Sequence, residues 1–223
     1  MAELKSYSIP TLKRLPGYLR ELRRLRRDGV ERVASPALGR ALQIDSISAR
    51  KDLEAIGAAG SPGVGYRVEE LIERIEGFLG WKNVSEAFII GVGELGSALL
   101  GYSGLASHGL RIVAAFDHRG PVRPGKTIHD VPVFGLEELA HLAHRLRIRM
   151  AILCVPDDEA QETADLLVKA GIVAIWNFTA QTLETPPGII RQNVNLAGDF
   201  AVLSVKLAQR LDEIDRVEQP EDM

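Results

Sequence analysis

Three glycines, Gly91, Gly93 and Gly96, form a G-x-G-x-x-G pattern within "FIIGVGELGSALLG", between an apolar run and a segment with helical character. In such a loop the first glycine permits a tight turn and the second lets the backbone approach a pyrophosphate. The third lets the following helix pack closely against the strand. The spacing predicts a dinucleotide site whose phosphate cradle is formed at Gly91, Gly93 and Gly96.

A carboxylate follows the next apolar run, "LRIVAAFD", at Asp117. It can accept hydrogen bonds from both hydroxyls of an adenosine ribose, and it would repel a 2′-phosphate. NAD(H) is therefore favoured over the phosphorylated coenzyme. His118 and Arg119 follow directly and weaken that discrimination.

A second set of residues with chemical potential lies in "SISARKDLEA", just before the glycine-rich stretch 58–67. A helical wheel places Arg50 and Lys51 on the exposed face, where they suit guanines and phosphates of a major groove. Ser46 and Ser48 can bind phosphates near the helix start. The stretch 58–67 predicts a tight hairpin or wing. A solvated helix face would carry the same cations, and the wing shifts the balance towards DNA.

The residues that catalysis would need are sparse. His141 and His144 share one side of an amphipathic helix, a spacing that could hold a metal, but a solvated face is the better interpretation. Cys154 ends a buried strand and is best read as a small core residue. Too little chain remains for a separate substrate domain, so we predict no catalytic and no metal site.

The elements that position these residues fall into two parts. Leucines at 12, 15, 19 and 22 mark a first helix, and two shorter helices follow before the glycine-rich hairpin, which is the order of a winged helix-turn-helix. From Asn83 onwards, short apolar strands alternate with helices. That rhythm predicts a parallel sheet wrapped by helices. A last amphipathic helix begins near Leu196.

Charge divides in the same way. The chain has 223 residues, of which 46% are hydrophobic and 26% charged, and its net charge is −3. Residues 1–67 carry 13 Lys and Arg against 7 Asp and Glu, so a basic head precedes an acidic body. A basic head suits a polyanion. No apolar run reaches the roughly 18–20 residues of a membrane span, and no export signal is evident. With one cysteine, a reducing cytoplasm is expected.

Several motifs in order carry a family resemblance across residues 8–212. They are "LKRLPGYLREL", "ARKDLEAIGAAGSPGVGYRV", "GVGELGSAL", "CVPDDEAQETADLLVKAGI", "AIWNF" and "NVNLA". Together they resemble the Rex family, bacterial redox-sensing transcriptional repressors that respond to NADH and NAD+. The resemblance implies a homodimer that reads an inverted repeat of operator DNA, with its carboxy-terminal helix swapped onto the partner.

The resemblance also implies roles for single residues. Arg50 and Lys51 would be the cations of the recognition helix. The wing that reaches the minor groove would include Gly63, Gly65 and Tyr66. The phosphate cradle would also include Val92, Glu94 and Leu95. The cofactor cleft would be lined by Val155 and Pro156, and the residues towards the nicotinamide would be Asn177, Phe178 and Tyr102.

The sequence departs from the family pattern at three places. Pro62 stands where the wing usually has an arginine, and Ser48 and Ala49 stand where the recognition helix usually has glutamine and valine. Asn195 replaces an aspartate that, in the family, is thought to switch between Tyr102 and Arg20 as NADH enters. An asparagine cannot form the charged pair with the arginine, so the switch residues Arg20, Tyr102 and Asn195 would couple more weakly.

We therefore predict an α/β chain, an N-terminal winged helix-turn-helix followed by a Rossmann-like doubly wound parallel sheet. The expected divisions are 1–80 for DNA binding, 81–195 for NAD(H), 196–216 for the swapped dimerisation helix and 217–223 for a flexible tail. The expected function is a repressor that NADH releases from DNA. Two alternatives are a small NAD-dependent oxidoreductase with a basic appendage, and an assembly factor with a vestigial nucleotide site.

Overall fold

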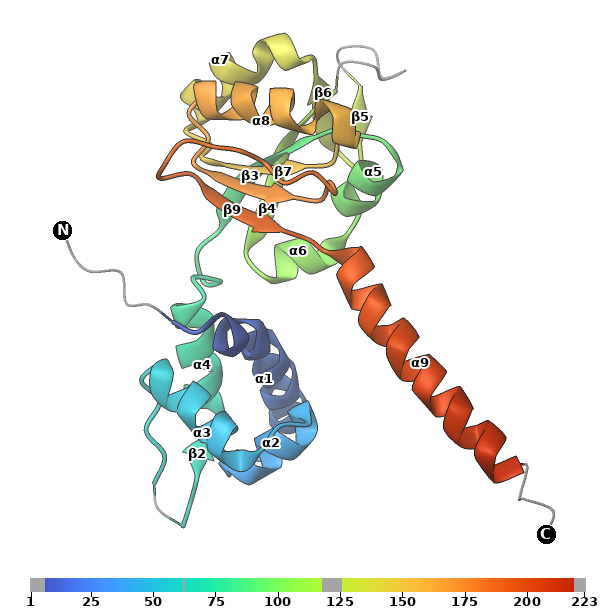
Figure 1. Cartoon of the computed structure of the whole chain (residues 1–223). Helices are drawn as coiled ribbons and strands as arrows, with labels where there is room; N and C mark the ends of the chain where they lie inside the picture. Colours follow the sequence, from blue (N-terminus) through green and yellow to red (C-terminus); the bar gives the residue numbers. More distant parts are fainter. Residues whose placement is uncertain (1–6, 62, 118–125, 219–223) are drawn as a thin grey trace. The chain divides into compact units, whose positions relative to one another are not determined.

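The computed structural model describes residues 7–61, 63–117 and 126–218 (Figure 1). The chain forms two compact units, Met1–Val84 and Ser85–Met223. The division falls four residues later than the expected boundary at 80/81, because the segment after the fourth helix stays with the first unit.

The first unit is a winged helix-turn-helix, as predicted. A two-stranded antiparallel ribbon pairs Val33 with Tyr66. Just before its second strand, an antiparallel bridge joins Ser61 to Gly65 across the base of the wing. The described elements are α1 (Ile9–Arg27), β1 (Arg32–Val33), α2 (Ser35–Leu42), α3 (Ser46–Ala55), β2 (Tyr66–Arg67) and α4 (Val68–Phe78).

Local chemistry explains where α2 and α3 begin. The Asp45 carboxylate accepts the backbone N–H of Ser48 at 2.8 Å and so caps α3. Hydrogen bonding from the side chain and then the backbone of Ser48 lowers the pKa of Asp45. Helix α2 starts at Ser35, with Ala34 in the capping position. A Cβ on Gly39 would lie 2.9 Å from the carbonyl oxygen of Ile44, so the close turn between α2 and α3 needs a glycine there.

The core of this unit is built on α1. Leu15, Leu19 and Leu22 are buried on one face and pack with Leu38 of α2 and Leu53 of α3. Pro16 lies inside α1 and is exposed, so the missing N–H of the ring falls on the solvent side of a helix that continues to Arg27. Apolar contacts therefore hold α3 against α1 and α2.

The second unit contains the expected doubly wound sheet. Among the described residues it has seven strands in the order β5-β6-β4-β3-β7-β8-β9, and every neighbouring pair except β5–β6 is parallel. Leaving out β5, the order is that of dinucleotide-binding Rossmann folds. The strands are β3 (Ser85–Ile90), β4 (Leu110–Phe116), β5 (Thr127–Ile128), β6 (Val131–Phe134), β7 (Met150–Leu153), β8 (Ala174–Asn177) and β9 (Ile190–Asn193).

Helices cover both faces of this sheet. Phe88 and Ile90 of β3 pack in one cluster with residues of α7 (Leu139–Leu146) and α8 (Ala160–Lys169), which lie over the same side in Figure 1. Ile89 points into a second cluster that includes Leu99 of α5 (Glu94–Leu100) and Leu105 of α6 (Ser103–Ser107). This alternation is what a strand buried on both faces requires.

One expected helix is two. The segment after the glycine loop was predicted to continue as a single helix, but the structure breaks it at Gly101 and Tyr102. A Cβ on Gly101 would lie 2.8 Å from the ring of His129, so the turn brings the backbone against that ring. The break places Tyr102 at the start of α6.

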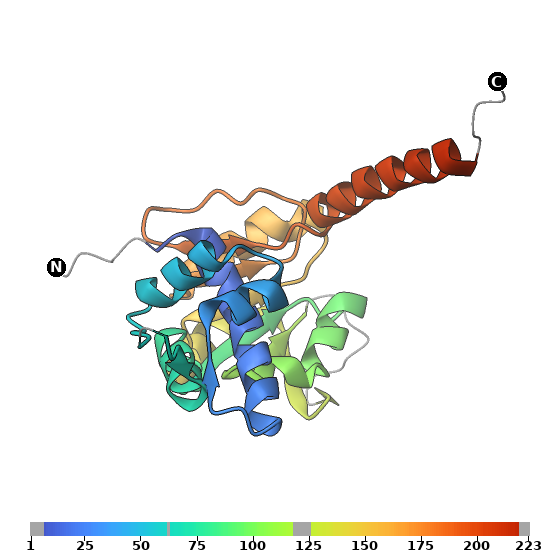
Figure 2. The same ribbon diagram turned by 90° about the horizontal axis from the view of Figure 1, so that it is seen from below.

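Helix α9 (Leu196–Glu218) follows β9 and extends from the sheet as one long helix (Figure 2). It continues two residues beyond the expected end at 216. Its large apolar side chains are exposed, and an exposed apolar surface of this extent on a helix is typical of an interaction face. They are Leu196, Phe200, Val202, Leu203, Val205, Leu207, Leu211 and Ile214.

Candidate functional site

The glycine loop joins the end of β3 to α5. Gly91 has a φ of +90°, and its N–H donates to the carbonyl of Phe116 at 2.8 Å. A Cβ on Gly91 would lie 2.6 Å from the carbonyl oxygen of Cys154, and one on Gly96 would overlap the Gly91 carbonyl. Glycine is therefore required at both positions by the packing of the loop against β7 and α5.

Gly93 has the opposite surroundings. It is exposed, and a Cβ there would meet no heavy atom within 4 Å. The backbone at Gly93 is thus open to an approaching group, as a pyrophosphate site needs. Glu94 and Leu95 beside it are also exposed.

A cleft of about 400 Å³ opens beside the loop, where β3, β4 and β7 end. It lies at the switch point of the strand order, the place where open α/β sheets bind ligands. Its lining is mainly apolar. The lining residues are Ile90, Gly91, Gly93, Leu95, Phe116, Asp117, Leu136, Cys154, Val155, Pro156 and Glu159.

Asp117 stands at the end of β4, half-buried at the edge of this cleft. Its Oδ2 atom accepts the backbone N–H of buried Val92 at 2.8 Å. The bond ties the carboxylate to the glycine loop, so the two predicted parts of a dinucleotide site lie together. His118 and Arg119 lie outside the described residues.

Cys154 also lines the cleft, and burial raises the pKa of its thiol to about 12. The thiol is therefore protonated at neutral pH and is a poor nucleophile. Cys154 is half-buried in the cleft wall, so it is not simply a core residue.

Of the residues placed along the coenzyme by resemblance, Val155 and Pro156 line the cleft, whereas Asn177, Phe178 and Tyr102 are not among its lining residues. Asn177 is 0% exposed, and its amide is bonded within the protein. It donates to the Gln181 carbonyl at 2.9 Å and to Asn193 Oδ1 at 3.2 Å, and it accepts from Thr179. Asn177 therefore holds the turn after β8 and does not face the cleft.

The two aromatic residues of this set lie elsewhere on the second unit. Phe178 is half-buried, with its ring centroid 4.9 Å from that of Trp176. Tyr102 is 60% exposed, and its ring lies over Gly104, where a Cβ would overlap it.

Asn195 has a role that the sequence analysis missed. Its Oδ1 atom accepts the N–H of Gly198 at 2.8 Å, so it caps α9. The signal was present, because asparagine directly before an amphipathic helix is a preferred cap. Arg20 is exposed on α1, in the other unit.

The exposed face of α3 carries the predicted DNA-facing cations. Arg50, Lys51 and Ser46 are exposed, and Ser48 is half-buried. The guanidinium of Arg50 lies 3.5 Å from the carboxylate of Glu54 in a solvent-exposed pair. Such a pair holds the side chain only weakly, so Arg50 is available to a ligand.

The wing depends on glycines, but its tyrosine lies differently from the expectation. Gly63 and Gly65 have φ values of +71° and +82°, which favour glycine. Tyr66 was expected to reach DNA, yet it is 8% exposed and packs in the core. Its partner across the ribbon, Val33, is buried too, so the inward face of the ribbon needs an apolar ring there. Pro62 lies outside the described residues.

Comparison with known proteins gives the same division of the chain. Residues 8–54 match the family described as "Putative DNA-binding protein N-terminus", and residues 83–181 match the "CoA binding domain" family. A redox-sensing transcriptional repressor Rex from Treponema denticola is 42% identical over 93% of this chain and 98% of its own length. The Rex protein of Caldicellulosiruptor bescii is 35% identical over 97% of this chain and its whole length.

The chain belongs to the Rex family. Among solved structures, the Rex-family repressor RSP in complex with β-NAD+ and operator DNA is 34% identical, covers 97% of this chain and 100% of its own, and has a TM-score of 0.85. RSP in complex with β-NADH is 34% identical, covers 96% of this chain and 99% of its own, and has a TM-score of 0.82. The Rex relatives are named as transcriptional repressors, so the oxidoreductase reading is set aside.

Among the described residues the structure has neither a membrane-spanning helix nor a cluster of metal ligands. None of their helices is both long enough and apolar enough to pass through a bilayer. Among these same residues, no three His, Cys, Asp or Glu side chains come together as a metal site would require. His141 and His144 are both exposed on α7.

Proposed function

We propose that this Rex-family chain is a redox-sensing repressor that binds operator DNA as a homodimer through α3 and the wing, and leaves the DNA when NADH occupies the cleft. One observation carries the proposal. A single chain joins a winged helix with exposed cations to a Rossmann sheet whose glycine loop and carboxylate suit a dinucleotide.

The residues of the cleft fit NAD(H). Gly93 leaves its backbone open to the pyrophosphate, while Gly91 and Gly96 keep the loop against β7 and α5. Asp117 would accept from the hydroxyls of the adenosine ribose. Val155 and Pro156 would contact the bound coenzyme along the apolar wall. The coenzyme itself supplies the redox signal, since its reduced ring is uncharged and its oxidised ring is cationic.

On the DNA side, Arg50 and Lys51 would contact guanines and phosphates in the major groove, and Ser46 and Ser48 would bind phosphates. Gly63 and Gly65 would let the wing follow the minor groove, with Tyr66 supporting it from the core. Helix α9 would pack its apolar side chains on the partner subunit, which brings two such heads to an inverted repeat.

Release requires that NADH bind the DNA-free form more tightly than the DNA-bound form, because equal affinity would shift nothing. Reciprocity then requires operator DNA to weaken NADH binding by the same factor, about 1–3 kcal/mol of coupling. NAD+ would occupy the cleft without releasing the repressor.

The switch would involve Tyr102, Asn195 and Arg20, as the family resemblance implies. Asn195 can hydrogen-bond either partner but adds no charge, so its bond with Arg20 would be weaker than that of an aspartate. Its position at the start of α9 links that contact to the dimerisation helix. We also infer a cytoplasmic location, since the DNA and the coenzyme pool that it senses are there.

The test measures fluorescence anisotropy of a labelled inverted repeat of the family type. NADH should release wild-type protein, and NAD+ should not. Asp117→Ala should bind the duplex normally but require at least about tenfold more NADH for release, because the ribose contact is lost. Consumption of NADH with a small carbonyl compound, or binding of the duplex that NADH leaves unchanged, would contradict the proposal.

A further inference from the structure

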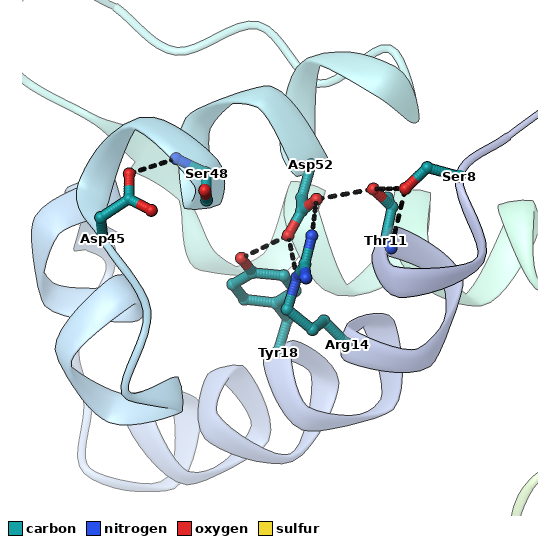
Figure 3. Close-up of polar contacts among 7 residues, drawn as sticks. All are labelled: Ser8, Thr11, Arg14, Tyr18, Asp45, Ser48 and Asp52. Atoms are coloured by element: carbon teal, nitrogen blue, oxygen red, sulfur yellow. Dashed lines mark hydrogen bonds and ion pairs between the residues drawn. The ribbon is translucent and has the colours of Figure 1, made fainter.

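A buried carboxylate lies on the inward side of the recognition helix. Asp52 of α3 is 2% exposed, and four hydrogen bonds converge on it (Figure 3). Arg14 donates through Nε to Oδ2 at 2.6 Å and through Nη2 to Oδ1 at 2.7 Å. Thr11 Oγ1 donates to Oδ1 at 2.7 Å, and the Tyr18 hydroxyl donates to Oδ2 at 2.9 Å.

All of these donors come from one element. Thr11, Arg14 and Tyr18 lie at spacings of three and four residues, which place them on one face of α1. The network continues to the start of that helix, where Ser8 caps α1 and its hydroxyl lies 2.9 Å from that of Thr11. A continuous polar connection thus runs from the first turn of α1 to the middle of α3.

Apolar packing alone would leave the rotation of α3 about its own axis less well defined. Ala49 and Leu53 press α3 against the core, but hydrophobic contact has no preferred direction. A carboxylate held by a two-pronged arginine and two hydroxyls has a defined orientation as well as a position. Successive side chains of a helix are 100° apart about its axis. Because that angle is fixed, the orientation of Asp52 also sets the directions of Arg50 and Lys51 on the same helix.

We propose that Asp52 is a positioning residue of DNA recognition, which locks the rotation of α3 against α1 so that Arg50 and Lys51 meet their bases in register. This inference rests on the proposed function. It predicts that loss of the lock reduces sequence discrimination more than general affinity for DNA, because phosphate contacts tolerate small rotations and base contacts do not.

The opposing forces at Asp52 support this role. Burial acts to raise its pKa, but the hydrogen bonds from Arg14, Thr11 and Tyr18 together outweigh burial and lower it. The carboxylate is therefore charged at neutral pH. A charged group that is buried with all its donors supplied from one neighbouring helix is strongly committed to that arrangement.

The experiment compares three variants of the full-length protein. Asp52→Asn keeps the shape but turns an amide N–H₂ towards groups that donate. Tyr18→Phe removes one donor and leaves the arginine in place. Glu76→Gln is the matched control, because Glu76 receives a bond of 2.8 Å from Arg23 of α1 but lies on α4.

Two quantities are measured at fixed salt. The first is the ratio of affinities for the inverted-repeat duplex and for a random duplex of equal length. The second is amide hydrogen exchange of α3 relative to α4. For Asp52→Asn we expect the ratio to fall about tenfold or more and exchange of α3 to rise, with random-duplex affinity within about threefold of wild type. Tyr18→Phe should give a smaller change in the same direction, and Glu76→Gln none.

Several outcomes would overturn the inference. One is an unchanged ratio in both Asp52→Asn and Tyr18→Phe, and another is an equal loss in Glu76→Gln. If Asp52→Asn unfolds the head, Tyr18→Phe decides. The proposed function is tested by a different outcome: it fails if wild-type protein itself shows no preference for the inverted repeat. In that case, hydrogen exchange of α3 in the variants still tests whether Asp52 holds α3 against α1. Release by NADH should persist in every variant that retains DNA binding, since the cleft lies in the other unit.

Discussion

Gly91 packs so closely against Cys154 that a Cβ on the glycine would lie 2.6 Å from the cysteine carbonyl oxygen, and its φ of +90° is one that other residues rarely adopt. Two residues later, Gly93 has no heavy atom within 4 Å of the same position. The first glycine is therefore needed by the fold, and the second is free for a ligand.

Alanine substitutions should separate these two roles. Gly93→Ala should leave the melting temperature within a few degrees of wild type but weaken NADH binding by at least about tenfold, because the methyl group occupies the space of the pyrophosphate. Gly91→Ala should destabilise the fold by about 1–3 kcal/mol through strain and the clash with β7. Thermal melts and NADH titrations measure both. Normal NADH affinity in a folded Gly93→Ala protein would show that the coenzyme does not approach this loop.

Removal of the Arg50 side chain should weaken operator binding by about 1–3 kcal/mol and relax preference at one base pair. The fold should lose only a few tenths of a kcal/mol, because the pair with Glu54 is exposed and long. Arg145→Ala, on the exposed face of α7, is a control of equal charge. Equal losses of operator affinity in the two variants would show that Arg50 contributes only general electrostatic attraction to DNA and makes no base contact.

Asn195→Asp should strengthen the response to NADH. Aspartate caps a helix as well as asparagine does, so α9 should keep its stability, while the added charge permits a charge-assisted bond with Arg20. The NADH concentration that releases half of the DNA-bound protein should fall severalfold. The double variant Asn195→Asp with Arg20→Ala should lose the shift. An identical shift without the arginine would exclude this pairing.

Acid should weaken the head of the protein through Asp52. Its pKa in the folded protein is lowered, so its contribution to stability is present above the unfolded value of about 4 and is lost as pH falls through the folded pKa. Exchange protection of α1 and α3, corrected for the intrinsic exchange rate at each pH, should therefore fall more steeply between pH 6 and pH 3 in wild type than in Asp52→Asn. Parallel pH profiles would show that Asp52 does not contribute.

The sequence predicted the parts whose chemistry is local. The glycine spacing and the carboxylate after β4 each follow from short-range geometry, and the structure places both as that geometry requires. The two-domain order follows from periodicity, because the head has amphipathic helical spacing and the body has short apolar strands that alternate with helices.

Other features depend on distant parts of the chain. Strand β9 is exposed and largely polar, so it has no apolar pattern, and only pairing with β8 reveals it. The burial of Tyr66 depends on β1, which is two residues long. Asn177 looked like a ligand-facing amide, yet Thr179, Gln181 and Asn193 use all of its bonding capacity. The two strand pairings and the bond from Asn177 to Asn193 join residues far apart in the sequence, so no local pattern encodes them.

The central claim is that NADH and operator DNA bind the same dimer antagonistically. Titration of NADH into the protein with and without saturating operator duplex, followed by NADH fluorescence, tests it most directly. We predict that the duplex weakens NADH binding about 5- to 150-fold, by the same factor as NADH weakens duplex binding, and that NAD+ shows no such loss. Equal NADH affinity in the two titrations would contradict the account, even if both ligands bind.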